Sequence, residues 1–191
     1  MKKVLSVIAC TATLLSTPTF AKQVRLASDF TYPPFNYKDQ SGNPTGFDIE
    51  IADALCAEAK LDCTWVAQNW DSLIPSLLAR KSDVIMASMR ITEERKKRVL
   101  FTNKYYQTPA RFVTATDAKV DISAQGMKDK VIGVQGGTIH DRYVTDKFGD
   151  VAEIKRYTGQ DEVYIDMVNG RLDLTFGLSL IHISEPTRQI R

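Results

Sequence analysis

The segment Ser88–Arg95 combines residue types that can hold a carboxylate. It follows the apolar run Asp83–Ala87, which is typical of a buried strand, and Thr92 stands where a helix N-cap belongs. A small hydroxyl, free backbone N–H groups at a helix start and the guanidinium of Arg95 together favour binding of an anionic group. The alternative for this segment is an ordinary strand–loop–helix corner with Arg95 on a solvated face.

The elements that must position this segment alternate between strand and helix patterns through residues 22–177, which predicts an α/β fold. Strands are expected at residues 23–28, 63–67, 83–87, 111–115, 131–135, 153–157 and 172–176. Helices are expected at residues 47–60, 139–148 and 161–169, with two more capped by Asp71 and Thr92. The apolar spacing predicts that Phe47, Ile51 and Leu55 face inward in the first of these helices, and Val163, Met167 and Val168 in the last. The turn-rich segment 38–44 predicts a hairpin.

A polar segment of little periodicity, residues 117–128, suggests a boundary between two lobes. We therefore expect a first lobe at residues 22–115 and the beginning of a second lobe at residues 116–177. The second lobe, at about 65 residues, is thin for an independently stable α/β unit.

The N-terminal residues 1–21 have the pattern of a secretory signal peptide. Lys2 and Lys3 precede an apolar stretch too short to span a bilayer, and residues 19–21 form a small-x-small cleavage pattern. The mature chain is expected to start near Lys22 and to be exported.

Residues 178–191 resemble the translated read-through of a transposase-type sequencing adapter. We expect this tail to lie outside the fold, which would leave the second lobe and the hinge incomplete. His182 belongs to the tail, so His140 is the informative histidine.

The net charge does not imply a nucleic-acid partner. The whole chain carries 25 basic and 23 acidic residues, but without the signal and the tail 21 basic and 22 acidic residues remain. A net charge near −1 gives no basic patch for nucleic acid or for a membrane surface.

Cys56 and Cys63 remain after signal cleavage, and two cysteines in an exported chain favour a disulfide. Their spacing fits a bridge from the last turn of a helix to the following strand. Metal binding is the competing interpretation, but two cysteines with no nearby histidine make a poor site.

Several motifs occur in an order that resembles one family. They are Tyr32–Phe35 (Tyr-Pro-Pro-Phe), Gly46–Ala52 (Gly-Phe-Asp-Ile-Glu-Ile-Ala), Leu73–Leu77, Ile91–Arg95 with Phe101–Tyr106, Val131–Thr138 and Gly170–Asp173. The pattern is similar to the polar amino-acid-binding proteins of bacterial ABC importers, the family-3 extracellular solute-binding proteins. The Cys56 and Cys63 pair also looks like the single disulfide of the basic amino-acid binders in that family.

This resemblance implies a type II periplasmic-binding-protein-like α/β fold of two lobes. Such a receptor is a periplasmic monomer that closes on one free amino acid and presents it to an inner-membrane ABC permease. It needs no cofactor and no metal, and it is not an enzyme. The expected ligand is a basic amino acid (arginine, lysine, ornithine or histidine) or an opine.

The resemblance also implies roles at the carboxylate end of the ligand. Arg95 would clamp the α-carboxylate bidentately, helped by the backbone of residues 88–90 and by the helix start at Thr138. Ser88 would contact the α-amino group.

At the side-chain end, Tyr32 and Trp70 would sandwich the aliphatic part of the ligand, unless they are ordinary core aromatics. Asp29 occupies the position that faces the far end of the side chain in basic amino-acid binders, where a carboxylate suits a guanidinium or an ammonium. The alternative for Asp29 is a loop-capping aspartate.

Several positions depart from the family pattern. Ala87 stands where close relatives have serine, and Arg90 puts a cation near the cleft. Ile139 and His140 replace polar positions, and His140 would either bond the ligand or cap its helix. Leu178 stands where the family usually has an aspartate that accepts from the ligand amino group.

Two alternatives compete with the receptor interpretation. One is a cyclohexadienyl-dehydratase-like enzyme on the same fold, which would need a general acid where only Asp29 and His140 are available. The other is a non-functional fragment, which predicts weak or absent binding.

Overall fold

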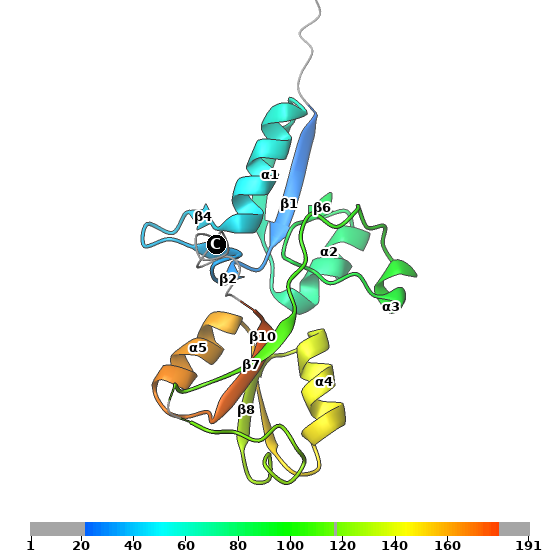
Figure 1. Ribbon diagram of the computed structural model, residues 1–191. Helices are drawn as coiled ribbons and strands as arrows, with labels where there is room; N and C mark the ends of the chain where they lie inside the picture. The colour runs from blue at the N-terminus through cyan, green and yellow to red at the C-terminus, as the bar shows by residue number, and fades with distance from the viewer. Residues whose placement is uncertain (1–21, 117, 180–191) are drawn as a thin grey trace, which may run out of the picture.

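The computed structural model describes residues 22–116 and 118–179, which form two α/β lobes (Figure 1). The predicted signal peptide, residues 1–21, and residues 180–191 of the adapter-like tail lie outside the described residues. Within the described ranges, no helix has the length and apolar character needed to cross a bilayer.

The first lobe is built on a parallel sheet with strand order β5-β1-β6. Its elements are β1 (Gln23–Ser28), β2 (Thr31–Tyr32), β3 (Asn36–Lys38), β4 (Pro44–Thr45), α1 (Phe47–Glu58), β5 (Asp62–Ala67), a 3-10 turn (Trp70–Ser72), α2 (Leu73–Leu78), β6 (Val84–Ile85) and α3 (Glu93–Lys96). Strands β2, β3 and β4 form a small antiparallel sheet, which confirms the predicted hairpin.

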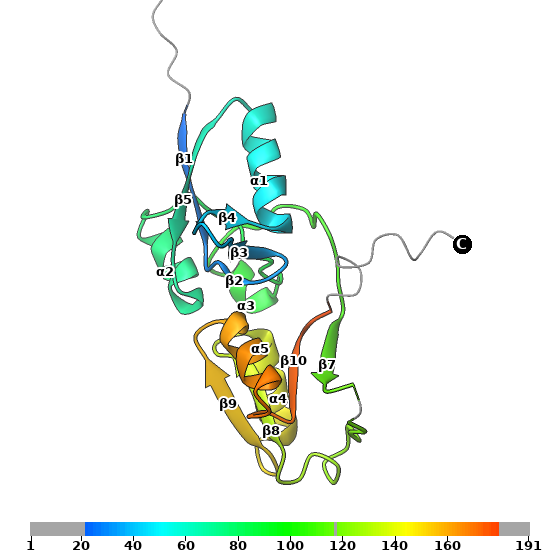
Figure 2. The ribbon, with the colours of Figure 1, turned by 90° about the vertical axis from the view of Figure 1, so that its left-hand side faces the viewer.

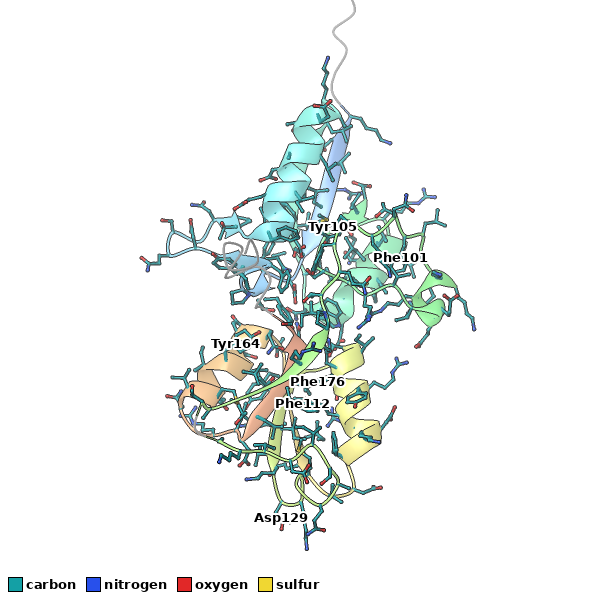
Figure 3. The ribbon with its side chains drawn as sticks, in the orientation of Figure 1. Phe101, Tyr105, Phe112, Asp129, Tyr164 and Phe176 are labelled. Atoms are coloured by element: carbon teal, nitrogen blue, oxygen red, sulfur yellow. A yellow bond between two sulfur atoms is a disulfide. The ribbon has the colours of Figure 1, made fainter. Side chains whose placement is uncertain are left out.

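The second lobe is a four-stranded sheet with order β7-β10-β8-β9, in which only β7 runs antiparallel to its neighbour. Its elements are β7 (Ala110–Thr114), β8 (Val131–Gln135), α4 (Ile139–Phe148), β9 (Glu153–Tyr157), α5 (Gln160–Val168) and β10 (Leu174–Leu178). Helices α4 and α5 flank the sheet (Figure 1). Phe112 and Phe176, labelled in Figure 3, pack with ring centroids 4.5 Å apart.

Strand β7 pairs with the sheet of the second lobe, although the boundary expected after residue 115 assigned it to the first. Its partners in β10 run from Leu178 opposite Ala110 to Leu174 opposite Thr114. The described part of the polar segment, residues 118–128, packs onto the second lobe, because Met127 near its end is fully buried in the core of that lobe. The chain therefore passes between the lobes before β7, as Figure 2 shows.

Two chain segments, at Thr108–Pro109 and at Ser179, lie side by side between the lobes. The backbone N–H of Ser179 donates to the carbonyl of Pro109 at 2.8 Å, and the Thr108 hydroxyl donates to the Ser179 carbonyl at 2.9 Å. Leu178 and Ser179, the first residues of the expected tail, thus extend the second-lobe sheet toward the first lobe.

The hydrophobic pattern predicted the wrong buried face for α1, and it predicted burial of one α5 residue that is exposed. Leu55, expected to face the core, is 61% exposed, while Asp48, Ile49 and Ala52 are buried. Val168, also expected inside, is 89% exposed. The buried face of α1 includes Asp48, whose carboxylate has hydrogen-bonding partners inside the protein. A pattern of apolar residues alone does not predict such a face.

Several element boundaries also differ from the sequence prediction; β6, for example, covers Val84–Ile85 instead of residues 83–87. Asp71 does not cap α2; it lies inside the 3-10 turn that precedes Leu73, and Ser72 is the N-cap residue. The last strand starts at Leu174 instead of residue 172, and the carboxylate of the preceding Asp173 accepts hydrogen bonds from the Lys130 ammonium and the Val131 N–H.

The predicted disulfide is confirmed. Cys56 in α1 and Cys63 in β5 are joined by an S–S bond of 2.01 Å. The bond ties the end of the helix to the next strand, and it rules out the competing metal-binding interpretation for these two thiols.

Candidate functional site

A cavity lies between the two lobes. The first lobe lines it with Tyr32, Trp70, Ala87, Ser88, Arg90 and Arg95. The second lobe lines it with Gln135, Thr138, Ile139, His140 and Leu178. Most of these residues follow the carboxyl ends of β1, β6 and β8, where ligands usually bind in open α/β sheets. All predicted ligand-binding residues line this cavity except Asp29, which contacts the lining residue Gln135.

The turn from β6 to α3 presents Arg95 to the cavity. The Thr92 hydroxyl accepts a hydrogen bond from the Arg95 N–H at 3.2 Å, which confirms the predicted N-cap. The guanidinium donates to the carbonyl of Arg90 at 3.0 Å and lies 5.5 Å above the centroid of the Trp70 ring. Burial lowers the pKa of Arg95, yet an arginine stays charged. Its further N–H groups form a fork that suits a carboxylate.

Ser88 is held by a buried carboxylate, Asp48. Ser88 has a φ of 49° and donates its hydroxyl to Asp48 at 2.7 Å, while the Tyr106 hydroxyl donates to Ser88 at 2.5 Å. Asn36 and Tyr105 also donate to Asp48, at 3.1 and 2.7 Å. Burial raises the pKa of Asp48, and these hydrogen bonds oppose the rise. Ser88 keeps one lone pair that can accept from an ammonium group.

The opposite wall is the start of α4. Gly137 has a φ of 69°, which turns the chain at the end of β8, and Thr138 caps the helix by accepting from the Asp141 N–H at 3.1 Å. The Thr138 hydroxyl also donates to the Gln135 carbonyl at 2.9 Å. The hydroxyl hydrogen is therefore committed to the protein, and the helix start offers backbone N–H groups to an anion instead.

His140 lies in the first turn of α4 and does not cap it, since Thr138 has that role. The imidazole is buried and packs edge-on against Phe176 at 5.5 Å between centroids. Its Nε2 atom has no hydrogen-bond partner within the described chain. Burial, together with the charges of Arg90 and Arg95, lowers the pKa of His140 to about 4, so the ring is neutral at pH 7.

Asp29 follows β1 and faces the second lobe. Its Oδ2 atom accepts hydrogen bonds from Gln135 Nε2 at 2.8 Å and from the Thr31 hydroxyl at 3.1 Å. Its Oδ1 atom is buried and has no partner among residues 22–116 and 118–179. Burial raises the pKa of Asp29. A carboxylate with one free buried acceptor is a suitable counter-group for a cation.

The two predicted aromatic residues bond to the second lobe as well as lining the cavity. Tyr32 packs edge-on against Phe35 at 5.7 Å, and its hydroxyl accepts from the Leu178 N–H at 2.9 Å. The indole N–H of Trp70 donates to the carbonyl of Gly137 at 3.2 Å. Both residues line the cavity and make a polar contact across the lobes, and their role on either side of a ligand stays a prediction.

The sequence of the chain matches a known family. The bacterial extracellular solute-binding proteins, family 3, match residues 24–173. This chain belongs to that family. The finding confirms the fold class expected from the sequence, the two-lobed type II periplasmic-binding-protein fold.

Relatives within the solute-binding family include an L-arginine-binding protein of Pseudomonas aeruginosa. It is 46% identical over 176 residues, which are 91% of this chain and 68% of that protein. Among solved structures, a Salmonella typhimurium periplasmic binding protein with high arginine specificity has a TM-score of 0.77 at 32% identity, covering 89% of this chain and 75% of the other.

A second solved structure relates the fold to an enzyme. It is an ancestral amino-acid-binding protein described as a precursor of cyclohexadienyl dehydratase, with a TM-score of 0.78 at 32% identity, covering 86% of this chain and 73% of the other. That protein is itself an amino-acid binder.

Sequence reasoning missed two residues of this solute-binding site. Gln135 lines the cavity and bonds to Asp29. The available signal was a polar residue that ends an otherwise apolar strand. Asp48 holds Ser88, and its signal was an acid in the first turn of a helix on the buried side.

Proposed function

We propose that this protein is the periplasmic substrate-binding component of an amino-acid ABC importer and that its ligand is a basic amino acid, with arginine as the first candidate. The observation that carries the ligand assignment is a cavity with Arg95 on its wall and the free Oδ1 of Asp29 beside its lining. One group suits a carboxylate and the other a cation, and a basic amino acid carries both.

At the backbone end of the ligand, Arg95 binds the α-carboxylate, and the N-terminus of α4 adds N–H groups and a favourable dipole. Ser88 accepts one hydrogen bond from the α-amino group, since its own hydrogen is committed to Asp48. Leu178 lines this cavity where the family commonly has an aspartate, so the amino group has fewer acceptors here.

At the side-chain end, the aliphatic part of the ligand lies between Tyr32 and Trp70, and its cationic end faces Asp29. Arg90 also lines the cavity and is a further cation. Because Arg90 is exposed while Asp29 Oδ1 is buried, solvent screens the repulsion more than it screens the attraction.

The role proposed is binding and not catalysis. A dehydratase would need a general acid at its leaving group, and His140, neutral at pH 7, would be a poor acid there. We further propose that residues 1–21 direct export to the periplasm, that the receptor acts as a monomer, and that it delivers its amino acid to an inner-membrane permease.

Isothermal titration tests this proposal on the chain from Lys22 onward. Arginine, lysine, ornithine and histidine are compared with glutamate and glutamine. We expect heat of binding with basic amino acids, and tighter binding in a Leu178→Asp variant, which restores an acceptor for the amino group. Tighter binding of glutamate or glutamine would overturn the ligand assignment.

An Arg95→Lys variant tests the carboxylate end in the same titration. Lysine lacks the planar fork of arginine, so arginine affinity is expected to fall by about ten- to a hundredfold. Arg98→Lys is the matched control, because Arg98 is exposed and does not line the cavity. Equal effects of the two substitutions would argue against the role of Arg95.

A further inference from the structure

The start of α5 in the second lobe packs against β2 of the first lobe (Figure 2). Gly159, the N-cap residue of α5, meets Thr31 of β2 there, and neither residue lines the ligand cavity. A Cβ atom at position 159 would lie 2.7 Å from Thr31 Cβ and 3.0 Å from Thr31 Cγ2. Non-bonded carbon atoms pack at about 3.5–4.0 Å, so the first lobe leaves no room for a side chain at this position.

The backbone of α5 does not require glycine at position 159. Gly159 has a φ of −128° and a ψ of 157°, which is extended backbone that any residue adopts. The Glu162 carboxylate already accepts hydrogen bonds from the N–H groups of Thr158 and Gly159, at 3.0 and 3.2 Å. A serine at position 159 would complete a capping box with Glu162, which is a favoured helix start.

A substitution at position 159 also meets Asp161 of the same helix. The Asp161 carboxylate lies against the site of such a Cβ and accepts from the Glu162 N–H at 2.9 Å. This carboxylate is the end of a side chain and can rotate away, and the oxygen of a capping serine can accept from the same N–H. The contact that cannot yield in this way is the one with Thr31 in the other lobe.

The next residue of β2 meets a second glycine of the second lobe. A Cβ atom at Gly177 in β10 would lie 2.7 Å from the hydroxyl oxygen of Tyr32, which accepts from the Leu178 N–H at 2.9 Å. Two consecutive residues of the first lobe, Thr31 and Tyr32, therefore face glycine backbone of the second lobe. Close approach of backbone is a common use of glycine.

We propose that Gly159 is a positioning residue for amino-acid binding: because it has no side chain, the second lobe can seat on β2 and both walls of the cavity can reach one ligand. This inference rests on the proposed function and adds to it a residue outside the cavity. A side chain at position 159 would hold the lobes apart while each lobe stays folded. The closed arrangement would then be less populated, and the apparent affinity would fall with that population.

Gly159→Ser tests this role, because its effects within α5 and across the lobes have opposite signs. The capping box favours the helix, whereas the contact with Thr31 becomes overfilled. We expect arginine affinity to fall by about ten- to a hundredfold, through faster dissociation, while the fold is kept. Calorimetry and stopped-flow kinetics measure the affinity and the rate. Small-angle X-ray scattering should give a larger radius of gyration for the variant, with and without arginine.

Gly136→Ser is the matched control in the same lobe. A Cβ atom at position 136 would lie 3.6 Å from the Tyr157 carbonyl oxygen, an ordinary contact that does not involve the first lobe. Thr31→Gly provides the second test, because it removes the two atoms that a side chain at position 159 would meet. In that background Gly159→Ser should lower arginine affinity by less than about twofold, and the double-mutant cycle isolates the coupling between the two positions.

Thermal unfolding of each variant reports whether the fold is kept. The role of Gly159 would be overturned, with the proposed function left standing, if Gly159→Ser caused no loss of affinity, the same loss as Gly136→Ser, or the same loss with and without Thr31→Gly. If neither the original chain nor Leu178→Asp binds an amino acid, the proposed function itself fails. The scattering of the ligand-free chains then decides the role of Gly159, and equal radii of gyration would overturn it.

Discussion

Polar side chains around the cavity are held by hydrogen bonds to the protein and, within the described residues, each keeps a further acceptor that can meet a ligand. Ser88 donates to Asp48 and retains a lone pair, while Asp29 accepts from Gln135 and Thr31 through one oxygen and leaves the other free. Side chains held in this way lose little conformational freedom when a ligand arrives, which favours affinity.

His140 makes stability depend on pH. Its pKa in the folded chain is about 4, below the ordinary value of 6.5, because of burial and the charges of Arg90 and Arg95. Protonation therefore favours the unfolded chain. The contribution of the neutral ring is present above pH 6.5 and is lost as pH falls toward 4, up to about 3 kcal/mol.

Urea unfolding at pH 7 and pH 4.5 should accordingly show a smaller loss of stability for His140→Gln than for the original chain. Asp29 and Asp48 have raised pKa values, so their protonation stabilises the folded chain at acid pH and acts in the opposite direction. Both carboxyls are present in both proteins, and the difference between the proteins isolates His140. Parallel losses would contradict the assignment.

The sequence predicted helix starts and strands well where adjacent residues determine them. The N-cap Thr92, the helix start at Thr138 and the strand Val131–Gln135 could be recognised from a few adjacent residues. The assignment of β7 to the second sheet could not, because its partner is β10, more than sixty residues later. The contact of Gln135 with Asp29 is longer still in sequence and depends on how the lobes meet.

The disulfide that links α1 to β5 is expected to stabilise the folded chain. The Cys56–Cys63 bond closes a short loop, with a sequence separation of seven. Replacing both cysteines by serine should lower the free energy of unfolding by about 2 kcal/mol through the entropy of the unfolded chain. Urea unfolding measures this, and the reduced original chain should match the variant. A double variant as stable as the oxidised chain would refute the estimate.

The whole molecule is joined across the cavity by contacts from several elements. An ion pair of 2.8 Å links Glu94 of α3 to Arg142 of α4, and both side chains are exposed. The hydrogen bonds Trp70 to Gly137 and Leu178 to Tyr32 lie nearer the cavity. Together they favour the arrangement in which both walls can touch one ligand.

Glu94→Gln should weaken arginine binding by about two- to fivefold at low salt, the range for an exposed ion pair, and by less at high salt. Glu93→Gln is a close control, because Glu93 is in the same helix and, within residues 22–116 and 118–179, forms its ion pair with Lys96 of that helix at 2.8 Å. Titration at two salt concentrations separates the cases. A salt-independent effect, or the same effect in both variants, would exclude a cross-lobe role.

The chain contains two tryptophans, and their surroundings differ. Trp65 donates to Asp53 and packs on Phe30, both within the first lobe. Trp70 lies beneath the Arg95 guanidinium and shares its indole proton with the opposite lobe. Its fluorescence should therefore change when the lobes separate, whereas that of Trp65 should stay nearly constant. The molecule carries its own optical reporter of closure, and no dye needs to be attached.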